Sequence, residues 1–166
     1  KMPIKIQYKD MPHIKPVPMA TKEKGFFGGI VLWLVTTRKF ELTADWKYSL
    51  TMDGNKTAVN YIVPKGFVFD GASVPKYFRS WLSPMGVLLI GGLVHDYGYK
   101  YETLLLAGGK KVISKKNQKW MDKTFRDINI DVNGFKVINY IAYYALRLGG
   151  FMAWRGHRKR NIKWDD

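Results

Sequence analysis

Residues 88–99 read LLIGGLVHDYGY, an apolar segment in which two adjacent glycines precede a His-Asp pair. On an α-helix, His95 and Tyr99 would lie one turn apart on the same face, while Asp96 would point about 100° away. The glycines lie one turn before His95, and the space beside them could admit a substrate or let another part of the chain pack closely. We interpret this segment as the helix that carries the functional site. The alternative is a buried His-Asp pair that only satisfies its own hydrogen bonds.

Helical patterns continue after this segment. Ser83-Pro84 is typical of a helix start and Gly108-Gly109 of a helix end, so the first helix is expected to run to about Leu106. A second helix is predicted over residues 114–127, with Asp122 beside an apolar side formed by Trp120, Met121, Thr124 and Phe125.

A third helix is predicted after Asn133-Gly134, which is typical of a helix end. Its apolar residues follow helical spacing and are expected to face the core: Val137, Ile138, Ile141, Tyr144, Ala145, Leu148 and Met152. Arg147 lies within this helix, so its guanidinium group should either extend to solvent or pair with a carboxylate such as Asp96 or Asp122.

The first half of the chain favours β-structure. Four prolines among lysines predict an irregular arm over residues 1–25. Strands are predicted over residues 30–35, 40–46, 47–52 and 57–63, and Asp53-Gly54-Asn55 is typical of a hairpin turn. The predicted fold is therefore α+β, a small antiparallel sheet followed by three helices packed together. We expect a single domain with an arm (1–25), a sheet region (26–75), a helical region (76–154) and a basic tail (155–166).

The composition limits the possible functions. The 28 Lys and Arg outnumber the 13 Asp and Glu, so the net charge of +15 should attract polyanions or anionic lipid. The chain has no cysteine, which excludes disulfides, thiolate metal sites and a cysteine nucleophile. The apolar runs are too short to span a bilayer, so we expect a soluble protein without a transmembrane segment.

The pattern His-Asp-x-x-Tyr on one helix, followed by an Asp on a second, is similar to the catalytic pattern of secreted calcium-dependent phospholipases. That resemblance implies that His95 is the general base, that Asp96 binds Ca²⁺, and that Asp122 with Tyr99 orients the histidine. Asp70 is a second candidate metal ligand that could face His95, although Asp before Gly commonly forms a turn. A Zn²⁺ hydrolase that uses His95 with Asp70, Asp96 or Asp122 is the other metal-dependent alternative.

A further resemblance rests on the order of several motifs. They are VPKGF at 63–67, DGASVP at 70–75, HDYGY at 95–99, DKTF at 122–125 and YALRLG at 144–149. This order resembles a family of tailed bacteriophages and prophages known as domain of unknown function 1353. The resemblance covers roughly residues 30–154 and implies a phage origin, a small sheet followed by helices, and a polar centre at the His-Asp pair and the later Asp. With a phage origin, the expected location is the virion or the host cytoplasm. The family usually has Arg before that Asp, where this chain has Lys115 and Lys116.

Two functions follow from these patterns. The first is a metal-dependent hydrolase of a lipid, cell-envelope or phosphate-containing substrate. The second is a non-enzymatic virion, tail or assembly protein that docks on other phage proteins, an anionic polymer, a membrane surface or, by charge alone, nucleic acid. A catalytic site should be open to solvent and a structural pair sealed. The candidate anion-binding residues are Lys115, Lys116, Lys119, Arg147, Arg155, Arg158, Lys159 and Arg160.

Overall fold

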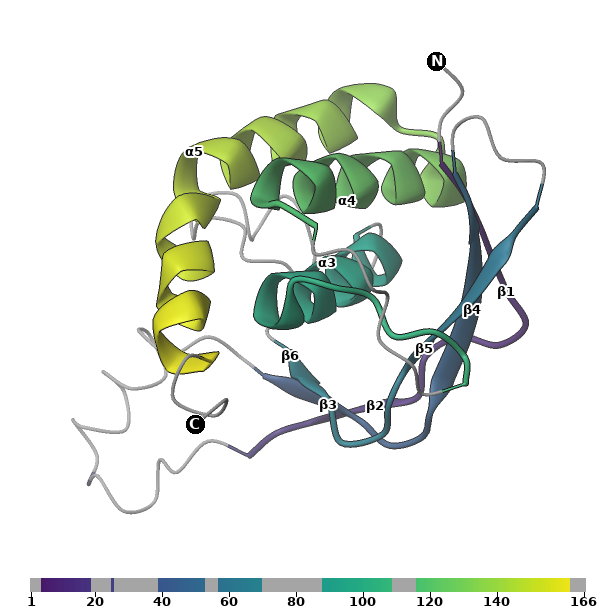
Figure 1. The fold of residues 1–166 in the computed structure, drawn as a ribbon, viewed down its shortest axis with the longest axis horizontal. Helices are drawn as coiled ribbons and strands as arrows, with labels where there is room; N and C mark the ends of the chain where they lie inside the picture. Colours follow the sequence, from purple (N-terminus) through teal and green to yellow (C-terminus); the bar gives the residue numbers. More distant parts are fainter. Residues whose placement is uncertain are drawn as a thin grey trace.

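The computed structural model describes residues 4–18, 25, 39–52, 57–69, 88–108 and 116–161, without the side chains of residues 158, 160 and 161. Within these ranges, two small antiparallel sheets are followed by three helices (Figure 1). The α+β prediction is therefore confirmed. The predicted strand over residues 30–35, the turn at 53–55, the Ser83-Pro84 helix start and the candidate ligand Asp70 lie outside the described residues.

The first sheet has the order β1-β4-β5 and combines Lys5–Tyr8, Trp46–Thr51 and Val59–Val63. Alternate residues of β4 (Trp46, Tyr48 and Leu50) point into the core, because side chains on a strand alternate between its two faces. Tyr48 stacks on Trp46 and on Tyr61 of the neighbouring strand. This aromatic layer forms the side of the core that faces the helices.

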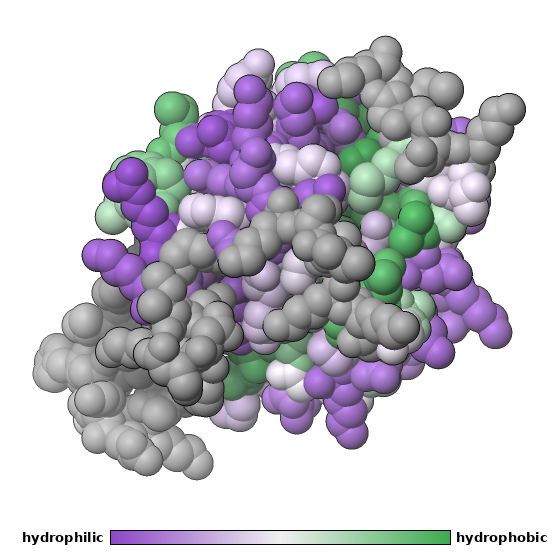
Figure 2. Space-filling model, viewed as in Figure 1, coloured by the Kyte–Doolittle hydropathy of each residue, from purple (hydrophilic) through white to green (hydrophobic). Residues whose placement is uncertain are grey.

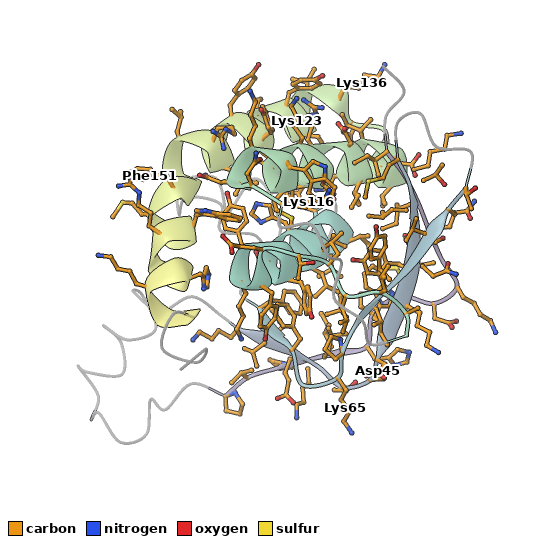
Figure 3. All side chains as sticks on the ribbon, viewed as in Figure 1. Asp45, Lys65, Lys116, Lys123, Lys136 and Phe151 are labelled. Atoms are coloured by element: carbon orange, nitrogen blue, oxygen red, sulfur yellow. The ribbon has the colours of Figure 1, made fainter. Side chains whose placement is uncertain are left out.

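The second sheet has the order β2-β3-β6 and combines Ile14–Pro16, Phe40–Leu42 and Val68–Phe69. The alternating pattern over residues 40–46 predicts one strand, but β3 ends at Leu42 and β4 begins at Trp46 in the other sheet. The Asp45 carboxylate accepts a hydrogen bond of 2.8 Å from the backbone N–H of Lys65, and Figure 3 labels both residues at this bend. The bend allows one continuous stretch of sequence to supply two sheets.

The N-terminal residues are not an irregular arm, and this prediction is wrong for the part that the structure describes. They form β1 and β2, each an edge strand of its sheet. An edge strand tolerates Pro16, because one side of its backbone needs no ladder partner. The N–H of Ile6 on β1 donates to the Asp131 carboxylate at 2.9 Å, so a helix satisfies part of this edge.

Helix α3 (Leu89–Tyr101) packs against β6 on one side and against the other two helices on another (Figure 1). It ends before the expected Leu106, because Glu102 takes a left-handed conformation (φ 57°) and its N–H bonds the Gly98 carbonyl. Leu105 and Leu106 then pair with β5, with a backbone bond of 2.8 Å from Ile62 to Leu105. The apolar residues after the helix therefore extend the first sheet.

Helix α4 (Gln118–Asn133) begins after Asn117, whose side chain accepts the N–H of Trp120 at 2.9 Å. It ends at Gly134, which has a positive φ of 72° and bonds the carbonyl of Ile130. The helix therefore starts after the predicted residue 114 and continues beyond residue 127, as far as the Asn-Gly pair.

Helix α5 (Lys136–Asn161) has 26 residues and includes part of the predicted basic tail. It changes direction near its middle (Figure 1). Gly149 and Gly150 lie near the middle of its sequence, and adjacent glycines favour a kink there. The residues that bury it against α3 and α4 are Asn139, Ala142, Tyr143, Leu146 and Gly150. Most of the residues predicted for its core face are exposed instead: Val137, Ile138, Ile141, Tyr144, Leu148 and Met152. The prediction of the buried face was wrong, because helical spacing does not show which of two apolar faces is covered.

Candidate functional site

The carboxylate of Asp122 is the centre of a hydrogen-bonded cluster formed by all three helices. Its Oδ1 lies 3.0 Å from Nε2 of His95 and accepts the hydroxyl of Tyr99 at 2.5 Å. Its Oδ2 accepts Nη1 of Arg147 at 2.8 Å. The expected convergence of His95 with Asp122 is confirmed, and Arg147 pairs with one of its two expected partners. We call these four residues the Asp122 cluster.

The helices bring the cluster together through their spacing. His95 and Tyr99 are four residues apart on α3, and their ring centroids lie 4.0 Å apart. Phe125 lies one turn after Asp122 on α4. Its ring packs edge-on against the imidazole of His95, with 5.4 Å between the ring centroids. The cluster is enclosed, because His95 is 1% exposed and Asp122 is 0% exposed.

Glycines allow the helices to approach each other around the cluster. A Cβ at Gly91 would overlap with the side chain of Asn129 on α4, whose Oδ1 accepts the Gly91 N–H at 3.1 Å. A Cβ at Gly98 would overlap with Sδ of Met121, and one at Gly150 would lie 2.6 Å from the Tyr99 hydroxyl. Of the two sequence alternatives for the glycines, close packing therefore holds at Gly91, because α4 occupies the space.

The cluster keeps Asp122 ionised. Burial would raise the pKa of this carboxyl, but hydrogen bonds from His95, Tyr99 and Arg147 and the charge of His95 hold the pKa below its ordinary value. An ionised carboxylate has no proton to donate, so the neutral imidazole must donate its Nε2 proton to Asp122. Nδ1 of His95 is then the unprotonated ring nitrogen.

Asp96 lies next to this nitrogen. Its Oδ1 is 3.5 Å from Nδ1 of His95, at the outer limit of a hydrogen bond. Burial would lower the pKa of His95, but hydrogen bonds to Asp122 and Asp96 and the charges of both carboxylates raise it above its ordinary value. Oδ2 of Asp96 is buried and has no hydrogen-bond partner among the described residues.

The described residues supply one candidate metal ligand beside the Asp122 cluster, the carboxylate of Asp96. Among the residues that the structure describes, no three His, Asp or Glu side chains gather as ligands. Asp96 could supply one carboxylate to a calcium ion, and its unpartnered Oδ2 is consistent with that role. Zinc binding through Nε2 of His95 would break the bond to Asp122. The roles of Asp96 and Asp70 as ligands stay predictions.

The candidate anion-binding residues have different environments. Arg147 neutralises Asp122, and Lys116 lies 5.3 Å from the centre of the Trp120 ring. Lys119 and Lys159 are exposed, and Arg155 is exposed over the ring of Phe151 at 5.6 Å. Lys115 and the side chains of Arg158 and Arg160 lie outside the described residues. Figure 3 shows Lys116 and Lys123 labelled near α4, whereas Arg155 and Lys159 belong to the far part of α5.

Three residues that shape the site were not predicted from the sequence: Asn129, Met121 in its contact with Gly98, and Gly150. Met121 was assigned only to an apolar side, although it packs directly onto Gly98. Gly150 lies three residues after Arg147 on α5, and this spacing could have predicted the buried face of the helix. A small residue one turn from an inward-facing Arg permits close helix packing on that face.

The fold and site define a class: an α+β protein whose three helices enclose a His-Asp-Tyr-Arg cluster. The family described as "Protein of unknown function (DUF1353)" matches residues 40–146, and the chain belongs to it. No curated protein and no solved structure matches the chain. Within the described residues, none of the helices is both long and apolar enough to cross a membrane.

Proposed function

We propose that this protein is a phage-encoded hydrolase that uses His95 as a general base. The observation that carries the proposal is the 3.0 Å contact between His95 Nε2 and Asp122. When the imidazole is neutral, this contact favours the proton on Nε2 and leaves Nδ1 able to accept a proton. Tyr99 donates to the same carboxylate oxygen, so the imidazole and the carboxylate are held together in one orientation. A lipid, a cell-envelope polymer or a phosphate-containing ester is the proposed substrate class.

In the proposed reaction, Nδ1 of His95 takes a proton from a water molecule as the oxygen attacks an ester carbonyl. The imidazolium that forms is stabilised by Asp122 through Nε2 and by the carboxylate of Asp96, 3.5 Å from Nδ1. The proton then passes to the leaving alkoxide, which restores the neutral imidazole. Arg147 holds Oδ2 of Asp122, so the carboxylate cannot rotate away from His95. A calcium ion held in part by Asp96 would supply positive charge to the oxyanion.

The proposal can be tested with a matched set of variants. Phosphatidylglycerol vesicles carrying a fluorogenic ester serve as substrate, assayed with calcium. His95→Asn removes the base with little change in shape, and kcat/KM should fall by about 10²–10⁴. Asp127→Asn is the control, because Asp127 lies on α4 but pairs only with Arg126 in the described contacts. Wild-type protein without activity, or His95→Asn with unchanged activity, contradicts the proposal.

The burial of the cluster favours a second candidate function. With His95 1% exposed, a substrate can reach Nδ1 only if the surrounding chain moves. In the second candidate, the cluster only fixes the packing of the three helices, and the protein is a non-enzymatic virion or assembly component. The assay separates the two, because a structural cluster predicts lower melting temperatures for His95→Asn and no hydrolysis by any variant.

A further inference from the structure

Helix α5 has two apolar faces, and only one of them is covered. The exposed face is a stripe with the spacing of one side of a helix, and its members are Val137, Ile141, Tyr144, Leu148, Phe151 and Met152. We call these residues the α5 stripe. Leu148 is 81% exposed, Val137 73% and Met152 71%. The residues that bury α5 lie on the opposite side of the helix.

The α5 stripe differs from scattered surface hydrophobics. Single exposed apolar side chains are ordinary, whereas a contiguous apolar patch on a protein surface marks an interaction site. In Figure 3, Phe151 points outward from α5, away from α3 and α4. Figure 2 shows hydrophobic green atoms over the same part of the molecule, next to hydrophilic purple atoms. The patch therefore combines apolar and charged groups on one surface.

The charge of α5 identifies the kind of partner. Lys136–Asn161 contains no Asp or Glu. Arg155 and Lys159 are exposed and continue the spacing of the stripe beyond Phe151 and Met152. A second copy of the chain would bring another net charge of +15 to this surface, and the resulting repulsion disfavours self-association. The partner must therefore offer an apolar layer beside negative charge.

We propose that the α5 stripe, with Arg155 and Lys159, binds the surface of an anionic phospholipid bilayer. In this arrangement the outer side of α5 at its bend faces the membrane, with its apolar side chains in the acyl boundary and its cations at the headgroup phosphates. Tyr144 and Phe151 suit the interfacial layer, where aromatic rings gather. Membrane binding does not require that His95 is catalytic, because the α5 stripe points away from α3, which carries His95, and away from the Asp122 cluster.

The test measures binding to vesicles of phosphatidylcholine with phosphatidylglycerol in equal parts, by cosedimentation, against pure phosphatidylcholine. Wild-type protein should bind the anionic vesicles at least ten-fold more tightly. Arg155→Gln with Lys159→Gln should weaken this binding by about 25-fold, because one cation near a charged surface contributes about five-fold. Equal affinity of wild-type protein for neutral and anionic vesicles overturns the proposal.

The apolar contribution is tested separately. The double variant Leu148→Ser with Met152→Ser should bind anionic vesicles at least ten-fold more weakly, whereas Met11→Ser should bind as wild type. Met11 is a matched control, because it is 55% exposed but lies between β1 and β2. Melting temperatures should stay unchanged, since these side chains are exposed. If the double variant binds as tightly as wild type, charge alone accounts for binding, and the proposal is overturned. If wild-type protein is a dimer and the double variant is a monomer, the α5 stripe is a self-association surface, which also overturns the proposal.

Discussion

Replacing Asp122 by alanine tests whether its carboxylate holds the three helices together. The substitution removes the acceptor that Asp122 provides for the buried Nε2 proton of His95 and for the buried hydroxyl of Tyr99. The loss of one such hydrogen bond to a buried donor costs about 1–3 kcal/mol, so the loss of both costs about 2–6 kcal/mol. The Arg147 side chain is 33% exposed and can turn to water, so its loss adds little. We expect the free energy of unfolding to fall by about 3–5 kcal/mol.

Urea denaturation followed by circular dichroism at pH 7 measures this loss. Asp131→Ala is the control, because Asp131 is also on α4 but accepts one backbone N–H at a partly exposed strand edge. That control should lose about 1 kcal/mol. Asp122→Asn keeps the shape of the side chain and one acceptor oxygen, so it should be destabilised less than Asp122→Ala. Its free energy of unfolding can still be measured if the alanine variant does not fold. A loss below about 1 kcal/mol for Asp122→Ala would refute the reasoning.

Three further predictions concern the same region. The pKa of His95 in the folded protein is raised above its ordinary value of 6.5, so the stability that protonated His95 contributes is complete below pH 6.5 and is lost as the pH rises through the folded-state pKa. Urea titrations should therefore show a free energy of unfolding that declines over this pH range, and His95→Asn should remove the decline. Gly98→Ala should lower the melting temperature by several degrees, because its Cβ would overlap with Sδ of Met121, and this methionine is fully buried and so has little room to move. Gly108→Ala, with open space around it, should change the melting temperature little; equal effects would contradict the packing argument. Removal of calcium with EGTA should abolish ester hydrolysis by wild-type protein, and Asp96→Asn should raise the calcium concentration needed for half-maximal rate; activity in EGTA would contradict the role of Asp96.

The sequence predicted the helical part of the site well, because the relevant contacts follow from fixed spacing. His95 and Tyr99 are four residues apart, so they must share a face once the helix forms. The pairing of Asp122 with His95 was expected from the resemblance to the phospholipase pattern, in which the Asp on the second helix orients the histidine. Asn129 was not predicted, since its bond to Gly91 depends on how α3 and α4 cross, which no local pattern encodes.

The strands were less predictable, because their pairing depends on distant residues. Prolines in the N-terminal stretch argue against a central strand, but β1 and β2 are edge strands, where Pro16 is tolerated. The end of α3 was misplaced for a similar reason. Leu104 to Leu106 continue a helical pattern in isolation, but β5 offers free backbone groups, and Leu105 accepts a hydrogen bond from Ile62. Tertiary pairing therefore decided both outcomes.

The wrong choice of the buried face of α5 connects the two proposals. Leu146 is 1% exposed and Leu148 is 81% exposed, and Arg147 lies between them with its guanidinium on Asp122. One turn of helix therefore has a core contact at Leu146, a contact with the Asp122 cluster at Arg147 and, at Leu148, a site of the proposed lipid contact. Because helical side chains have fixed relative directions, a bilayer that binds Leu148 also restrains the backbone that positions Arg147. Membrane binding should then stabilise the cluster, and anionic vesicles should raise the melting temperature of wild-type protein more than that of Asp122→Asn.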